Sequence, residues 1–149
     1  MAVFASTAKV NGTPLLNLIC TDKLPKEDWD ALKQRVIKGG ANIINLRGRS
    51  SFQSPAYVSV EMIAAAMGGK EFAWPAGTYV SSEGFDHIMM AMETKITKNG
   101  CTYSDVKGTP EEIAELKASF EHLCKMRDEV IGLGAIPAIS EWSKINPNL

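Results

Sequence analysis

The sequence predicts a single α+β domain in which an antiparallel sheet packs with long helices. Hydrophobic residues alternate from Ile88 to Ile96 and are followed by Asn99-Gly100, a pair that favours a tight hairpin turn. Residues 101–106 can return as the partner strand, and residues 110–131 carry hydrophobic residues at helical spacing. The 149 residues contain no internal repeat, low-complexity tract or linker, so one domain is expected.

The first residues favour a second hairpin. Residues 3–10 alternate as a strand would, and Asn11-Gly12 can supply the left-handed conformations of a two-residue turn before Thr13. We therefore expect strand pairing from the first residues onward.

A broken long helix is expected next. Pro25 suits a first-turn position, and Glu27 and Asp28 suit the positive end of a helix dipole. Gly39-Gly40 interrupts the helical pattern, and hydrophobic residues then continue as far as Leu46.

Two further helix starts are signalled by capping residues. Ser54-Pro55 reads as an N-cap serine followed by proline at the first helical position, and Gly68-Gly69 marks the end of that helix. Thr109 and Glu112 have the spacing of a capping box that opens the last long helix, with glycines 132 and 134 at its end. The tail can hold a short helix around Trp142.

Charge and cysteine content exclude several classes of protein. Sixteen basic and seventeen acidic residues give a net charge of -1, and no block of lysine and arginine is available to neutralise phosphates, so no nucleic-acid partner is expected. No hydrophobic run approaches the roughly 18–20 residues that span a bilayer, so no membrane partner is expected. Three widely spaced cysteines favour a reducing compartment without a metal site, and we predict a cytoplasmic location.

Several reactive residues favour a structural interpretation. Asp86 and His87 are neighbours on a predicted strand and would point to opposite faces, so they could not form a hydrogen-bonded dyad. His122 is interpreted as a solvated or half-buried helix residue, and Cys124 as part of a hydrophobic helix face. No glycine-rich phosphate-binding fingerprint follows a strand.

The segment between residues 47 and 54 carries a cluster of hydrogen-bond donors. It reads Arg-Gly-Arg-Ser-Ser-Phe-Gln-Ser and lies beside a predicted helix start. Short hydroxyl groups next to a helix N-terminus could bind a carboxylate or a carbonyl oxygen. A capped helix break decorated with arginines explains the same residues equally well, and spacing alone leaves both interpretations open.

The run GGANIINLRGRSSFQSPA resembles the helix-loop-helix of the C-terminal, substrate-side domain of the lactate and malate dehydrogenases, and the malate dehydrogenases most. The opening MAVFASTAKVNGTPL, the strand WPAGTYV and the closing EEIAELKASFEHLCKMRDEVI fall in the family's order. The motif at residues 39–56 is the specific part of the match. The resemblance implies NAD as cofactor and the interconversion of malate and oxaloacetate.

The resemblance assigns binding residues to this chain but no catalytic ones. Ser50 matches a family position that lines the substrate pocket, Ser51 and Arg49 lie beside it, and Ser54 matches a position near the nicotinamide. Arg47 is expected to be structural. The family's catalytic histidine, aspartate and arginines would lie upstream of Met1, together with the glycine-rich loop that binds NAD.

The resemblance therefore predicts that residues 1–149 are part of a longer enzyme that requires an N-terminal NAD-binding half. In isolation the chain is expected to lack activity, to expose hydrophobic surface and to self-associate. The full-length enzyme is expected to be a homo-oligomer. Two alternatives stay open: a binding or interaction module that holds a small dicarboxylate without chemistry, and a dehydrogenase of another 2-hydroxy acid such as lactate.

Overall fold

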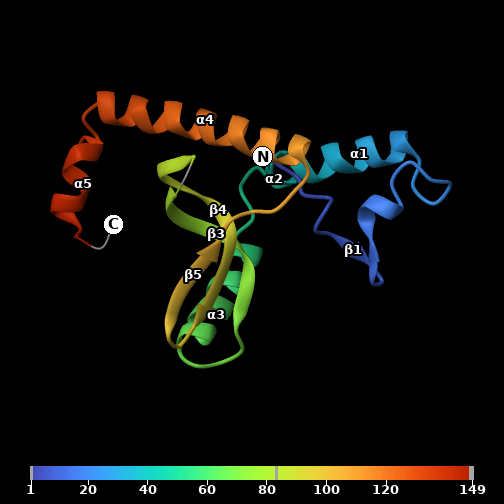
Figure 1. Ribbon diagram of the computed structural model, residues 1–149, viewed down its shortest axis with the longest axis horizontal. Coiled ribbons are helices and arrows are strands. Elements are labelled where there is room, and N and C mark those ends of the chain that lie inside the picture. The colour runs from blue at the N-terminus through green and yellow to red at the C-terminus, as the bar shows by residue number, and fades with distance from the viewer. Residues whose placement is uncertain (1, 83, 148–149) are drawn as a thin grey trace.

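A computed structural model describes residues 2–82 and 84–147. In the view of Figure 1, a three-stranded sheet lies below one long helix, and a shorter helix lies beside the sheet. The remaining helices extend away from this sheet and its two helices. The elements are β1 Lys9–Val10, β2 Thr13–Pro14, a 3-10 turn at Leu15–Asn17, α1 Lys26–Ile37, α2 Gly39–Arg47, α3 Gln53–Ala66, β3 Phe72–Ser82, β4 Phe85–Thr97, β5 Gly100–Ser104, α4 Pro110–Gly132 and α5 Ile139–Ile145.

The predicted central hairpin is confirmed. The sheet is antiparallel in the order β3-β4-β5, and β4 pairs with β5 through a turn that begins with Thr97 opposite Gly100. Gly100 has a φ of +125°, a conformation that side chains other than glycine's rarely adopt. β3 pairs with β4 over most of its length, from Phe72 opposite Ile96 to Val80 opposite Ile88.

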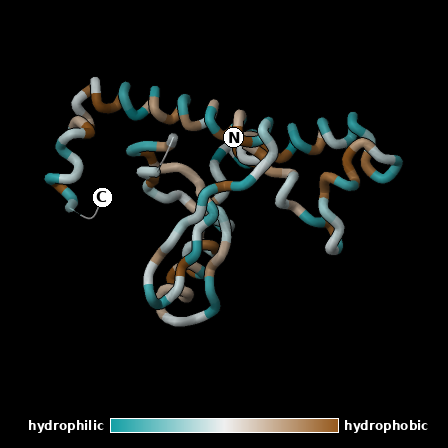
Figure 2. Tube along the Cα trace, in the orientation of Figure 1, coloured by the Kyte–Doolittle hydropathy of each residue, from teal (hydrophilic) through white to brown (hydrophobic). Residues whose placement is uncertain are grey.

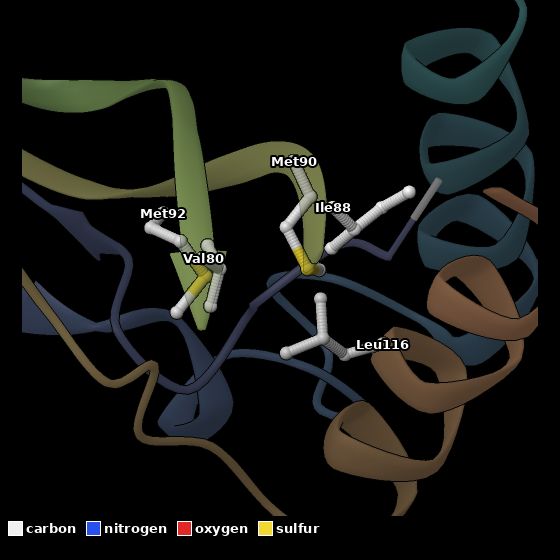
Figure 3. Packing of buried hydrophobic residues seen from close by; sticks show 5 residues of the cluster. All are labelled: Val80, Ile88, Met90, Met92 and Leu116. Carbon is white, nitrogen blue, oxygen red and sulfur yellow. The ribbon is translucent and has the colours of Figure 1, made fainter. Parts of the chain in front are cut away.

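The hydrophobic core lies on one face of β4. Burial alternates along this strand, with Ile88, Met90, Met92 and Thr94 buried and the residues between them exposed or half-buried. Figure 3 shows the side chains at 88, 90 and 92 gathered with Val80 of β3 and Leu116 of α4. Of the three methionines in β4, Met90 and Met92 lie on this buried face. Met89 points to the other face and is 59% exposed.

α4 begins with the predicted capping box. The Glu112 N–H donates to Thr109 Oγ1 at 3.3 Å, and the Thr109 N–H donates to Glu112 Oε2 at 2.9 Å. Pro110 is the first helical residue, where the missing N–H costs nothing. The capping box thereby satisfies the N–H groups of Thr109 and Glu112.

Thr109→Ala is expected to lower the free energy of unfolding by about 1 kcal/mol, because it removes the side-chain acceptor of one helix N–H. Urea denaturation followed by circular dichroism measures this loss. Thr102→Ala is the control, since the Thr102 side chain is exposed on β5, and its effect is expected to be smaller. Equal losses in both variants would show that the cap contributes nothing of its own.

The break in the long helix is confirmed, but it falls at Lys38, between α1 and α2. Gly39-Gly40, where the interruption was predicted, are the first two residues of α2. Pro25 occupies the N-cap position of α1, one residue before the position predicted for it. The prediction that Ser54 caps α3 is wrong. The first helical hydrogen bond runs from the Ala56 N–H to the Phe52 carbonyl at 3.0 Å, which makes Phe52 the N-cap and places Ser54 and Pro55 inside the first turn. Proline fits there because a first-turn N–H has no helical acceptor.

The predicted N-terminal strand is much shorter in the structure. Only β1 and β2 pair, through a turn whose Asn11 and Gly12 have φ values of 49° and 83°, as the sequence predicted. Residues 2–8 form no strand among the described elements and pack instead beside α4, where Ala5 is 6% exposed. The predicted strand is interrupted by a turn, in which the Ala8 N–H donates to the Ala5 carbonyl at 3.2 Å, so the alternating pattern alone misled.

Candidate functional site

The candidate site is the loop that joins α2 to α3. Gly48 ends α2 with a φ of +67°, and its N–H donates to the Ile44 carbonyl at 2.8 Å. The chain then turns away over four residues and re-enters a helix at Gln53. This glycine therefore sets the direction of the donor-rich segment predicted from the sequence.

An aromatic ring organises the two arginines of the loop. The guanidinium carbons of Arg47 and Arg49 lie 5.5 Å and 5.0 Å from the centroid of the Phe52 ring. Arg47 Nη1 also donates to Gln53 Oε1 at 2.9 Å, which closes the loop across its base. Both contacts fit the structural role expected of Arg47. Stacking on the ring holds the guanidinium groups without neutralising them.

The loop also presents free hydroxyl groups. Ser50 and Ser54 are exposed and Ser51 is half-buried, and in the described part of the chain none of their hydroxyls forms a hydrogen bond. Residues 47–54 include two arginines and no acidic residue. The N-terminus of α3, with its unpaired N–H groups, adjoins them. This combination suits an anionic or carbonyl ligand, although the exposure shows that these residues alone do not enclose one.

The two histidines have other surroundings. His87 Nδ1 lies 2.7 Å from the Tyr79 hydroxyl, and both rings contact Trp142 of α5, with centroid separations of 6.3 Å and 6.4 Å. His122 is exposed and lines a groove between α1 and α4. The predicted absence of an Asp86-His87 dyad agrees with these contacts, because His87 pairs with tyrosine.

Sequence reasoning missed two long-range polar contacts. Glu112 accepts hydrogen bonds from Ser6, and Arg127 of α4 donates to the backbone carbonyls of Asp86 and His87 at 3.2 Å and 3.1 Å. The capping box identified Glu112 as a helix-start residue. Nothing in the spacing indicates its second partner, which lies 106 positions earlier.

Residues 2–82 and 84–147 lack two classes of feature. No group of three or more histidine, cysteine or acidic side chains is placed to hold a metal ion. No helix in this part of the chain is long and hydrophobic enough to cross a membrane.

Large hydrophobic residues are exposed on both sides of the loop. In Figure 2, hydrophobic (brown) positions are visible on α3, the helix that follows the loop. Leu46 and Met67, near the ends of α2 and α3, are 87% and 83% exposed. Others at least half exposed on or next to α3 are Phe52, Tyr57, Val60 and Ile63. A hydrophobic surface of this kind is typical of an interface and fits the exposed face expected from the sequence.

The fold is shared with solved dehydrogenase structures. A malate dehydrogenase from Salinibacter ruber superimposes with a TM-score of 0.77 at 22% identity, covering 90% of this chain and 43% of that one. A lactate dehydrogenase from Enterococcus mundtii gives 0.69 at 19% identity, covering 89% and 41%. At this level of identity the likeness establishes the fold: the α/β domain found in both kinds of enzyme.

Sequence relatives and a family model identify the family to which this domain belongs. The malate dehydrogenase of Staphylococcus carnosus is 37% identical over 102 residues, which are 67% of this chain and 31% of the relative. That of Geobacillus kaustophilus is 35% identical over 113 residues, or 74% and 35%. Residues 1–131 match the lactate/malate dehydrogenase, alpha/beta C-terminal domain. The chain belongs to this family, as its C-terminal domain, and spans about a third of the length of the curated relatives it matches.

Proposed function

We propose that this chain is the substrate-side part of an NAD-dependent malate dehydrogenase and that the loop at residues 47–54 contacts the substrate. The observation that carries the proposal is the loop itself, in which free serine hydroxyls adjoin two ring-held arginines and a helix N-terminus. Ser50 and Ser51 donate hydrogen bonds to the substrate, and Ser54 lies toward the nicotinamide. Malate and oxaloacetate, both dicarboxylates, suit a loop with donors and no acidic residue.

We assign no catalytic residue to this chain. The acid-base histidine and its orienting carboxylate, together with the arginines that clamp the substrate, would come from an N-terminal NAD-binding part. When bound, NAD would accept the hydride from the carbon that bears the substrate oxygen, and NADH would return it. This chain would contribute only a small part of the NAD-binding site. The exposed Ser54 hydroxyl and the first turn of α3 offer hydrogen-bond donors to the cofactor, but they form no enclosing pocket. The task of this chain's residues is to orient the substrate.

Malate is preferred over lactate because the sequence relatives at 33–37% identity carry the name malate dehydrogenase. The fold does not distinguish malate from lactate as the substrate, because a malate dehydrogenase and a lactate dehydrogenase superimpose on this chain with the same TM-score of 0.69. A preference for a second carboxylate is consistent with the positive charge of the loop. We propose a cytoplasmic homo-oligomer, as the family resemblance implies.

The test is to assay the chain alone and joined to the N-terminal remainder of the Staphylococcus carnosus relative. We expect no NADH oxidation with oxaloacetate by the chain alone and measurable oxidation by the joined protein. The N-terminal remainder alone is the control. Activity of the isolated chain would contradict the assignment of all catalytic groups to the other part. A folded joined protein that is active with pyruvate and inactive with oxaloacetate would replace malate by lactate as the substrate.

A binding module without chemistry is the second candidate, favoured by hydroxyls that are free in the described chain. Calorimetry of the isolated chain with malate and oxaloacetate distinguishes it. Binding at millimolar ligand, combined with an inactive joined protein, would favour this module. If neither malate nor oxaloacetate gives a calorimetric signal, the binding module is excluded.

A further inference from the structure

Residues 2–8 are held on α4 by one buried carboxylate. Glu112 is 8% exposed, and its Oε1 accepts the Ser6 N–H at 2.9 Å. Its Oε2 accepts the Ser6 hydroxyl at 2.5 Å and the Thr109 N–H at 2.9 Å. The same carboxylate therefore caps α4 and binds Ser6, which lies 106 positions earlier in the sequence. An ionised carboxylate is the form that accepts three such bonds.

Packing around the carboxylate restricts the segment further. A Cβ atom added to Gly108 would lie 2.6 Å from Phe4 Cε1 and 2.8 Å from Glu112 Oε2, so a side chain at this position is excluded while Phe4 stays in place. Phe4 also packs against the cluster that contains Leu116. The segment thus has a polar anchor at Ser6 and a hydrophobic one at Phe4, and both meet the first two turns of α4.

The electrostatic surroundings favour the ionised form. Burial raises the pKa of Glu112, but the hydrogen bonds from Ser6 and Thr109 outweigh it and bring the pKa below its usual value. Residues 2–8 contain no ionisable side chain, and the packed residues of β4 are hydrophobic. The ionisable neighbours along the chain are Lys107, Glu111 and Glu115, and the last of these pairs with Lys33 at 2.6 Å.

We propose that Glu112 is a positioning residue whose carboxylate fixes residues 2–8 on α4 and so fixes the path of the polypeptide into this domain. The inference rests on the proposed function for its consequence in catalysis. The chain matches the family's C-terminal domain and spans about a third of its curated relatives, so on the proposed function the NAD-binding part would be joined to this domain through residues 2–8, the segment that Glu112 holds. A loosened segment would misplace the joined part relative to the loop at residues 47–54.

Hydrogen exchange in the 149-residue chain tests the docking directly. Glu112→Gln is expected to lower the protection factor of the Ser6 amide at pH 7 by about tenfold or more, the effect of one lost charge-assisted hydrogen bond. In the unmodified chain the same protection is present at neutral pH and is lost as the pH falls through the lowered pKa of Glu112. The variant is expected to lack this pH dependence.

Glu111→Gln is the matched control, because it removes an exposed carboxylate from the same helical turn. It is expected to leave Ser6 protection and its pH profile unchanged. If Glu112→Gln unfolds the chain, Ser6→Ala decides, since it leaves the Thr109 cap intact and removes only the hydroxyl bond. We expect this variant to lower Ser6 protection and to move the pH profile upward. Ser6 protection in Glu112→Gln equal to that in Glu111→Gln would overturn the docking.

Kinetics of the joined enzyme test the catalytic consequence. Glu112→Gln is expected to lower kcat about tenfold while KM for oxaloacetate changes less, because the substrate-binding loop is untouched. An active joined enzyme whose kcat is unaffected by a variant that has lost Ser6 protection would overturn the positioning role. A joined enzyme that is inactive even without substitution contradicts the proposed function instead, and the exchange experiment still decides the docking.

Discussion

Met92→Ala is expected to destabilise the domain by about 2–5 kcal/mol, the usual cost of truncating a large residue in a closed core. Met92 is 1% exposed and packs with Val80 and the other buried residues of β4 (Figure 3). Since small domains are stable by only about 5–15 kcal/mol, the loss would be a large share of the total. Urea denaturation followed by circular dichroism measures it.

The strand provides its own control. Met89→Ala removes the same atoms from the same strand, but Met89 is 59% exposed on the opposite face, so a change within about 0.5 kcal/mol is expected. Similar losses at both positions would mean that the two faces of the sheet are equally buried in solution. Self-association through the exposed face would produce that result, and light scattering would detect it.

The elements that sequence reasoning found correctly are those whose signals are local. Alternation along β4 translates directly into alternating burial, because successive side chains of a strand point to opposite faces. The capping box at Thr109 and Glu112 is satisfied within one turn of helix. The left-handed turn at Asn11 and Gly12 likewise needs no distant partner.

The wrong predictions concern segments whose conformation depends on residues distant in the sequence, or side chains that could serve either as a helix cap or in another contact. Residues 3–8 alternate like a strand, but the partner that fixes them is Glu112 and not a neighbouring strand. Ser54-Pro55 is a strong signal for a helix start, yet α3 begins earlier, at Gln53, whose side chain bonds Arg47 across the loop. The sequence identified the loop's donors by residue type. It could not show that Phe52 would stack with both arginines.

Ser50→Ala in the joined enzyme is expected to lower kcat/KM by roughly 5- to 150-fold, which corresponds to about 1–3 kcal/mol for a buried substrate group that loses its partner. Ser50 is exposed in this chain, so its hydroxyl is free to reach a ligand, and a joined domain that closes over the loop would exclude water from the contact. Steady-state kinetics with oxaloacetate and NADH provide the measurement.

Ser59→Ala is the control for this experiment. Ser59 lies in α3, one helical turn after Pro55, and its hydroxyl donates to the Pro55 carbonyl at 2.8 Å. Because this hydroxyl is bonded within its own helix, its loss should leave the kinetics unchanged. Ser51→Ala and Ser54→Ala then order the loop by distance from the reacting atoms, with Ser51 affecting oxaloacetate and Ser54 affecting the KM for NADH. If Ser50→Ala matches Ser59→Ala, the loop is a capped helix break, because its best-placed hydroxyl would then contribute nothing to the reaction.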